Sequence, residues 1–192
     1  DVSLLFAEIN HFLRINQLDV LIEKLEAAIE KEPDNVSLYS TMGNVYDNLY
    51  QRELAAGNEE EAKKYFDLAL KYYNDALSRK EDFTDAIYSI GALYFNKAAT
   101  MTQELQKIAD DLSKEGQRKY NELQTQINAE FDKALPYFIR VEKLKPNDIN
   151  TLIALKEIYA RKSDFEKSNE FKARLEKAQA GEPLSSYFEG KQ

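Results

Sequence analysis

The sequence contains no cysteine and a single histidine, His11. The absence of cysteine excludes disulfide bonds and thiolate metal sites. His11 has no second histidine or cysteine to complete a metal-binding set, and nothing in the sequence suggests the carboxylate-oriented histidine of a hydrolytic triad. We therefore interpret His11 as an ordinary surface or capping residue. We expect no catalytic residues, no metal site, no cofactor and no enzymatic activity.

Glycine and proline are also scarce, at six and four residues. The glycines are scattered singly, so they form no phosphate-binding loop. Leu, Ala, Glu and Lys are abundant instead, and because these residues favour helices we expect an all-α protein. No apolar run approaches the ~20 residues of a membrane-spanning helix, so we expect no direct insertion into a membrane.

Acidic residues outnumber basic ones by 34 to 26, which gives a formal charge of −8. A protein that binds nucleic acid has to neutralise phosphates with basic side chains, so nucleic acid is not an expected partner. An anionic membrane surface is disfavoured for the same reason. The adjacent carboxylates at 59–61 and 110–111 would point to different faces of a helix, so we interpret them as structural and not as acid–base pairs.

An internal repeat is visible in the spacing of bulky and small residues. If the first, bulky residue of each copy is counted as position 1, an apolar residue stands at position 4, a small residue at position 5 and an aromatic residue at position 8. The copies are Tyr39, Met42, Gly43 and Tyr46; Ile87, Ile90, Gly91 and Tyr94; Leu152, Leu155, Lys156 and Tyr159, with lysine in place of the small residue; and a weaker Leu5, Glu8, Ile9 and Phe12. One such match would be weak evidence, but three with the same offsets strongly predict repeated helix pairs.

A second helix follows in each repeat with its own shared offsets. Its residues are Leu21, Leu25, Ala28 and Pro33; Ala69, Tyr73 and Ala76; Ala134, Phe138, Val141 and Pro146; and a degenerate Ser168, Lys172 and Leu175. The small residues Gly43, Gly91 and Ala69 would let the two helices of a repeat approach closely. Pro33 and Pro146 would end helices and set the turn into the next repeat.

The sequence resembles the tetratricopeptide repeat (TPR) family over roughly residues 2–178. The resemblance implies an all-α, TPR-type α-α superhelix, a right-handed solenoid of helix pairs, in a single domain. The expected domain is 1–180, with repeats at about 2–35, 36–83, 84–148 and 149–178 and a C-terminal cap or disordered tail at 181–192. The repeat order also looks like TPR proteins of one large group of Gram-negative bacteria, which implies a periplasmic or envelope location. Composition alone would equally suit the cytoplasm. Because the chain begins at Asp1 and not at Met, we expect either a removed leader or a piece of a longer protein.

Two repeats are longer than the 34-residue TPR unit. Gly43 and Gly91 lie 48 residues apart, and Gly91 and Lys156 lie 65 apart. The extra residues keep apolar spacings of three and four, so we expect two elongated helical hairpins and not long loops. The turns are predicted near Gly57 in the shorter hairpin and at Gly116 in the longer one.

TPR proteins hold extended peptides in a concave groove lined by the first helix of each repeat, and the resemblance implies which residues occupy it. We call these the groove positions: Phe6, Asn10, Arg14, Asn44, Asp47, Asn48, Tyr88, Phe95, Asn96 and Arg161. Asparagine offers both a donor and an acceptor, which suits a peptide backbone. The aromatic rings would anchor the partner. Alternatively, a short, tight superhelix would bury these rings against its last helix.

These observations favour a non-enzymatic protein–protein interaction scaffold that holds a peptide or helix of an unknown partner in the groove. The alternative is an assembly module that makes homo-oligomers through the extended hairpin 98–134 or through the first helix. Leu4, Leu5, Phe12 and Leu13 of that helix have no preceding repeat to cover them, and solenoids need covered ends.

Overall fold

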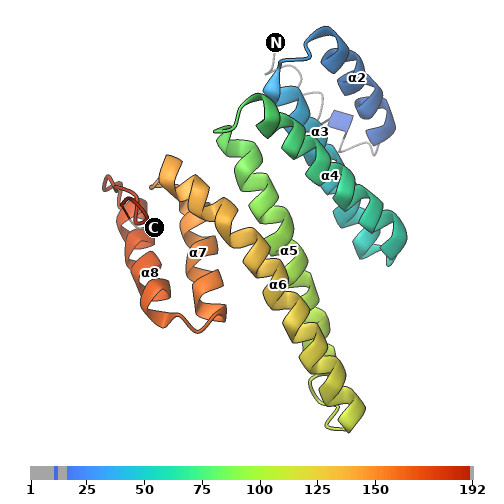
Figure 1. Ribbon diagram of the computed structural model, residues 1–192. Helices are drawn as coiled ribbons and strands as arrows, with labels where there is room; N and C mark the ends of the chain where they lie inside the picture. The colour runs from blue at the N-terminus through green and yellow to red at the C-terminus, as the bar shows by residue number, and fades with distance from the viewer. Residues whose placement is uncertain (1–10, 13–16, 191–192) are drawn as a thin grey trace. The chain divides into compact units, whose positions relative to one another are not determined.

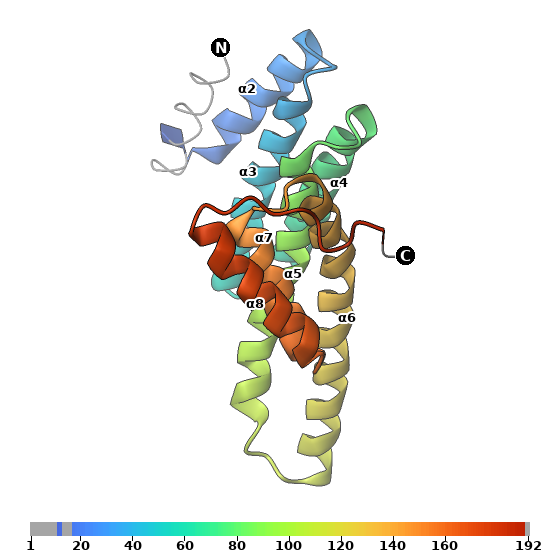
Figure 2. The same cartoon turned by 90° about the vertical axis from the view of Figure 1, so that its left-hand side faces the viewer.

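The computed structural model describes residues 11–12 and 17–190, and every regular element in this part of the chain is an α-helix (Figure 1). The helices are α2 (Leu18–Lys31), α3 (Val36–Ala55), α4 (Glu59–Arg79), α5 (Thr84–Ile108), α6 (Lys114–Leu144), α7 (Ile149–Arg161) and α8 (Phe165–Gln179). They pack as antiparallel pairs, α3 with α4, α5 with α6 and α7 with α8 (Figure 1, Figure 2). The prediction of an all-α fold of helix pairs with two elongated hairpins is confirmed.

The chain divides into two compact units, residues 1–86 and residues 87–192, and the division falls within α5. Each unit has its own fully buried side chains. In the first unit these include Leu21, Leu25, Met42 and Tyr73, and in the second they include Phe131, Phe138, Leu155 and Phe171. Each unit therefore has an apolar core of its own.

A close approach between α3 and α4 occurs at Gly43. A Cβ atom at this position would lie 2.5 Å from two ring carbons of Tyr73, so a side chain would displace the ring. Tyr73 is fully buried, as are Ala69 and Ala76 along the same face of α4. In the second unit, a Cβ atom at Gly91 would lie 3.2 Å from Cβ of Tyr137 on α6. The predicted close approach at both glycines is confirmed.

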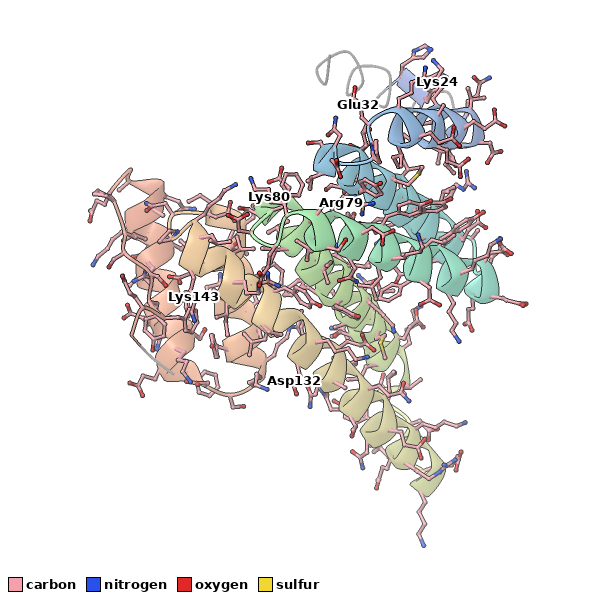
Figure 3. All side chains as sticks on the ribbon, turned by 45° about the horizontal axis from the view of Figure 1, so that its top comes forward. Lys24, Glu32, Arg79, Lys80, Asp132 and Lys143 are labelled. Carbon is pink, nitrogen blue, oxygen red and sulfur yellow. The ribbon has the colours of Figure 1, made fainter. Side chains whose placement is uncertain are left out.

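The turn between α2 and α3 is bonded to the end of α4. The carbonyl oxygen of Pro33 accepts hydrogen bonds from Oη of Tyr39 at 2.9 Å and from Nε of Arg79 at 2.7 Å. The guanidinium of Arg79, labelled in Figure 3, lies 3.7 Å from the centroid of the Tyr39 ring. α2 ends immediately before this turn, with Glu32 as its C-cap, as the position of Pro33 predicts.

The shorter hairpin turns at Gly57, as predicted. Gly57 has φ of +78°, a left-handed conformation that glycine adopts without steric penalty. Its backbone N–H donates to the carbonyl of Leu54 at 3.1 Å, and that of Asn58 donates to the carbonyl of Glu53 at 2.9 Å. This pair of bonds is the Schellman arrangement that closes helix C-termini.

The prediction that Gly116 forms the tip of the longer hairpin is wrong. α5 ends at Ile108 and α6 begins at Lys114, so Gly116 lies in the first turn of α6. The hydroxyl of Ser113 accepts a hydrogen bond from the Gly116 backbone N–H at 3.0 Å and caps the helix. A Cβ atom on Gly116 would lie 2.3 Å from the carboxyl carbon of Asp111. Glycine is needed here because the turn passes close to the helix that follows it.

The chain that follows α8 also belongs to the core of the second unit. Leu184, Tyr187 and Phe188 pack against the buried cluster. The ring of Phe171, on α8, is stacked on Tyr159 with centroids 5.7 Å apart and on Phe188 with centroids 5.7 Å apart. The described end of the chain is therefore fixed by aromatic packing.

Candidate functional site

The structure describes most of the groove positions, while Phe6, Asn10 and Arg14 lie outside the described residues. In the first unit, Asn44, Asp47 and Asn48 lie on α3; in the second unit, Tyr88, Phe95 and Asn96 lie on α5 and Arg161 on α7. The two sets are therefore considered within their own units.

Asn44 and Asn48 are both exposed and lie one helical turn apart on α3. Oη of Tyr73 donates to Oδ1 of Asn44 at 2.8 Å. Nδ2 of Asn48 donates to the backbone carbonyl of Asn44 at 2.7 Å. With these bonds made, Asn44 offers the N–H donors of its amide and Asn48 offers its amide oxygen as an acceptor.

Asp47 lies between the two asparagines in the sequence and is half-buried. Burial raises the pKa of its carboxyl, and a hydrogen bond donated by Nε2 of Gln51 at 3.3 Å acts in the opposite direction. The burial effect is larger, so this carboxyl binds a proton more readily than an ordinary aspartate.

Tyr88 and Phe95 are half-buried, and both rings pack on α6. The ring of Tyr88 meets that of Phe138 edge to face with centroids 5.7 Å apart, and the ring of Phe95 meets that of Phe131 in the same way at 5.2 Å. Burial, together with the nearby Asp148, raises the pKa of Tyr88. Part of each ring therefore serves the core of the second unit, and the rest is accessible.

Arg161 and Phe95 share a neighbour. The guanidinium carbon of Arg161 lies 4.9 Å from the centroid of the Phe131 ring, and the ring of Phe95 packs edge to face with that same ring. Arg161 is exposed, and so is Asn96, the residue that follows Phe95 on α5. The structure thus brings an aromatic and a cationic groove position together on Phe131.

Two side chains that organise these positions were not singled out as functional by the sequence. Tyr73 fixes the Asn44 amide, and Phe131 supports Phe95 and Arg161. The repeat offsets indicated only that Tyr73 faces its partner helix, and the apolar spacing of the longer hairpin, of which Phe131 is part, indicated only one apolar helical face. Their polar and cationic contacts come from residues about thirty positions away, for which the sequence carries no local signal.

Three tyrosines of the shorter hairpin stack on one another. The ring of Tyr46 is stacked on those of Tyr65 and Tyr72, with centroids 6.1 Å and 5.5 Å apart. Nζ of Lys71 lies 4.4 Å from the Tyr72 centroid. Burial, followed by the neighbouring Tyr72, raises the pKa of Tyr46 to about 12.

Among the described residues, no group of three His, Asp, Glu or Cys side chains could hold a metal ion. His11 is exposed, and its ring meets the edge of Phe12 with centroids 5.7 Å apart. No helix in the described part of the chain is both long enough and apolar enough to span a membrane. The expectation that the chain is not an enzyme stays a prediction.

Comparisons with known proteins identify no family. No family model matches the chain, and no curated protein matches it. Among solved structures, it is similar to a monomeric mutant of IFIT1 with m7Gppp-AAAA, at 16% identity and a TM-score of 0.38. That match covers 88% of this chain and 45% of the IFIT1 chain, so this chain spans a little under half the length of the protein it matches. A likeness this low carries no argument about function.

Proposed function

We propose that the chain is a non-enzymatic, TPR-type interaction scaffold that holds an extended peptide or a helix of a partner protein against the groove positions of its first helices. The observation that carries the proposal is the pair of exposed amides at Asn44 and Asn48 on α3. The net charge of −8 favours a protein partner over a nucleic acid.

The asparagine pair suits the backbone of a peptide. Asn44 offers N–H donors and Asn48 offers an oxygen acceptor one turn away, because their remaining polar atoms are bonded within the hairpin. A peptide presents both C=O and N–H groups along its length, so the pair can bond it without preference for its side chains. Tyr73 holds the Asn44 amide in a fixed orientation, which reduces the entropy lost on binding.

The second unit supplies groups of a different kind. Tyr88 and Phe95 present part of their rings, Asn96 and Arg161 are exposed, and Arg161 contacts Phe131, on which Phe95 also packs. Half-buried aromatic rings next to polar and cationic groups are typical of binding surfaces. These positions would anchor apolar side chains of the partner.

The test begins by selecting peptides that bind the chain from a random library and measuring their affinities by fluorescence anisotropy. Asn44→Asp keeps an oxygen for the Tyr73 hydroxyl but removes the N–H donors, and Asn48→Ala removes the acceptor. We expect the two changes together to weaken binding about tenfold, because two hydrogen bonds are lost.

Asn74 on α4 provides the matched control. It is exposed, and its Nδ2 donates to the carbonyl of Leu70 at 2.8 Å, the same local geometry as Asn48. Asn74→Asp introduces the same charge as Asn44→Asp and should leave affinity unchanged. Selected peptides that bind the Asn44 and Asn48 variant as tightly as the unmodified chain would overturn the groove proposal.

The alternative function, assembly of copies through the longer hairpin, is favoured by one specific observation. Leu112, in the turn between α5 and α6, is 79% exposed, and Tyr120 nearby is 36% exposed. Both line a shallow hollow of about 270 Å³ at this end of the hairpin. An apolar side chain so fully exposed is a candidate contact between copies.

A further inference from the structure

Residues 182–190, which we call the C-terminal segment, follow α8 outside any helix, as part of the red trace that leaves this helix in Figure 2. Side chains from the rest of the second unit bond four backbone groups of this segment. The groups are the carbonyls of Glu182 and Ser185 and the N–H groups of Leu184 and Tyr187. Such bonds fix the path of the segment through its backbone, and an extended peptide from another protein presents the same backbone groups.

Asn147, in the loop between α6 and α7, makes two of these bonds. Its Nδ2 donates to the Glu182 carbonyl at 2.6 Å, and its Oδ1 accepts from the Leu184 N–H at 2.8 Å. One amide side chain thus bonds the C=O of one residue and the N–H of the second residue after it. A neighbouring β-strand would bond an extended chain in the same way.

Glu142 and Arg174 make the other backbone bonds. Glu142 is fully buried on α6, and its carboxylate accepts from the Tyr187 N–H at 2.7 Å and from the hydroxyl of Ser186. Arg174 on α8 donates to Glu142 at 3.1 Å and to the carbonyl of Ser185. A buried carboxylate that loses such donors is strongly destabilised, so this site favours an occupant that supplies an N–H and a hydroxyl.

Aromatic rings hold the same segment against α8. The rings of Tyr187 and Phe171 meet edge to face with centroids 5.1 Å apart, and the ring of Phe188 is stacked on that of Phe171 at 5.7 Å. Leu184 packs against the same cluster. The apolar contacts therefore favour an occupant with a leucine and two consecutive aromatic residues, the first of them three positions after the leucine.

From these contacts we propose that Glu142, Asn147, Phe171 and Arg174 form a peptide-binding site, and that the C-terminal segment is its internal ligand. The partner is an extended segment of another protein with the pattern leucine, any residue, serine or threonine, and two aromatic residues. The site includes none of the groove positions, so either proposal can fail without the other.

A hollow of about 390 Å³ lies beside the aromatic pair. It is lined by Lys143 and Pro146 together with five residues of the segment itself, Ser185, Ser186, Phe188, Glu189 and Gly190. Lys143, labelled in Figure 3, is exposed and brings a positive charge to the hollow. A partner with an acidic residue after its aromatic pair would fit this charge, as Glu189 follows Phe188 in the chain itself.

The covalent connection makes the chain's own segment a strong competitor. A short flexible linker gives an effective concentration of about 1 mM, so a free peptide at micromolar concentration should not displace the segment. The chain leaves α8 through Gly181, whose φ is +79° and at which a Cβ atom would meet nothing within 4 Å. Gly181→Ala therefore strains only the turn and should shift the segment toward its released state.

The test uses the chain of residues 1–192 and a fluorescent peptide of residues 181–190, with binding followed by anisotropy. Tyr187→Ser with Phe188→Ser removes both rings of the internal ligand and leaves the site intact. We expect this variant to bind the peptide at least about tenfold more tightly than the unmodified chain, because the competitor is weakened. The Gly181→Ala variant should lie between the two, and a peptide with both aromatic residues changed to serine should not bind.

Two asparagines supply the site variant and its matched control. Within the double variant, Asn147→Ala should weaken peptide binding about tenfold, because it removes two hydrogen bonds. Asn150→Ala, at an exposed asparagine near the start of α7, should not change it.

Three results would overturn the proposal. The first is a double variant with native circular dichroism that does not bind the peptide. The second result applies if the double variant unfolds. It is a Gly181→Ala chain that binds the peptide no more tightly than the unmodified chain. The third is a concentration-dependent dimer of the unmodified chain that disappears in the double variant, because it would assign the site to a second copy and not to a partner protein.

Discussion

At the scale of single residues, Tyr73 joins the packing of the first unit to the surface that we propose binds a partner. Its ring fills the space that Gly43 leaves open. Its hydroxyl donates a hydrogen bond to the side-chain amide of Asn44, the residue that follows Gly43 on α3. A change in the glycine slot would therefore reach the proposed binding surface through a single side chain.

Replacing Gly43 with alanine should destabilise the fold. The added Cβ would lie 2.5 Å from the ring of Tyr73, which is fully buried and bonded through its hydroxyl. Overpacking of this kind costs about 1–3 kcal/mol in the free energy of unfolding. Gly91→Ala should cost less, because its nearest contact would be 3.2 Å. Urea unfolding followed by circular dichroism measures the free energy of unfolding of both variants. If Gly43→Ala lost no more of it than Gly91→Ala, the Tyr73 ring would have moved aside.

Tyr46 should make the stability of the protein depend on alkaline pH. Its pKa is raised from 10.0 to about 12 in the folded chain, mainly by burial, so folding favours the neutral phenol. The resulting stabilisation is complete below pH 10 and is lost as the pH rises toward 12. Tyr46→Phe keeps the ring without the ionisable group, so its free energy of unfolding should fall less steeply over this range. Tyr120→Phe, at an exposed tyrosine, is the control; equal slopes for Tyr46→Phe and the unmodified chain would contradict the assignment.

At the scale of helices, apolar spacing predicted the long hairpin but not its turn. Spacings of three and four place side chains on one helical face, and α5 and α6 are accordingly 25 and 31 residues long. Gly116 was assigned to the turn because glycine often marks one. In the structure it makes room for Asp111 while Ser113 caps the helix, and both roles depend on how the turn folds back.

The assembly alternative makes its own prediction at this scale. If copies associate through the tip of the hairpin, Leu112→Ser with Tyr120→Ser should abolish any oligomer seen by light scattering across a concentration series. Phe165→Ser provides the control, because Phe165 is an apolar residue 64% exposed at the start of α8. A chain that is monomeric at the highest concentration would count against assembly through the hairpin.

At the scale of the whole molecule, the sequence predicted local structure better than long-range contacts. The repeat offsets identified Gly43 and Gly91 because those residues contact the partner helix of the same pair. By contrast, the sequence did not decide whether residues 181–192 form a C-terminal cap or a disordered tail. Its apolar residues acquire neighbours only when Glu142, Asn147 and Phe171 come together from separate helices and a loop.

The same distinction applies to the groove positions. Asn44 and Asn48 share one face of a helix, which spacing alone predicts. The contact of Arg161 with Phe131 joins two helices and could be found only from the folded chain.

The location of the extra residues has a consequence for how such proteins vary. Gly43 and Gly91 lie in the first half of α3 and of α5, and the added length of the longer hairpin lies between Gly91 and the turn at 109–113. Seven more residues in each helix would extend the hairpin by about 10 Å without altering any contact at Gly91. The length of this hairpin is therefore free to change in evolution or design, independently of the contacts at Gly91.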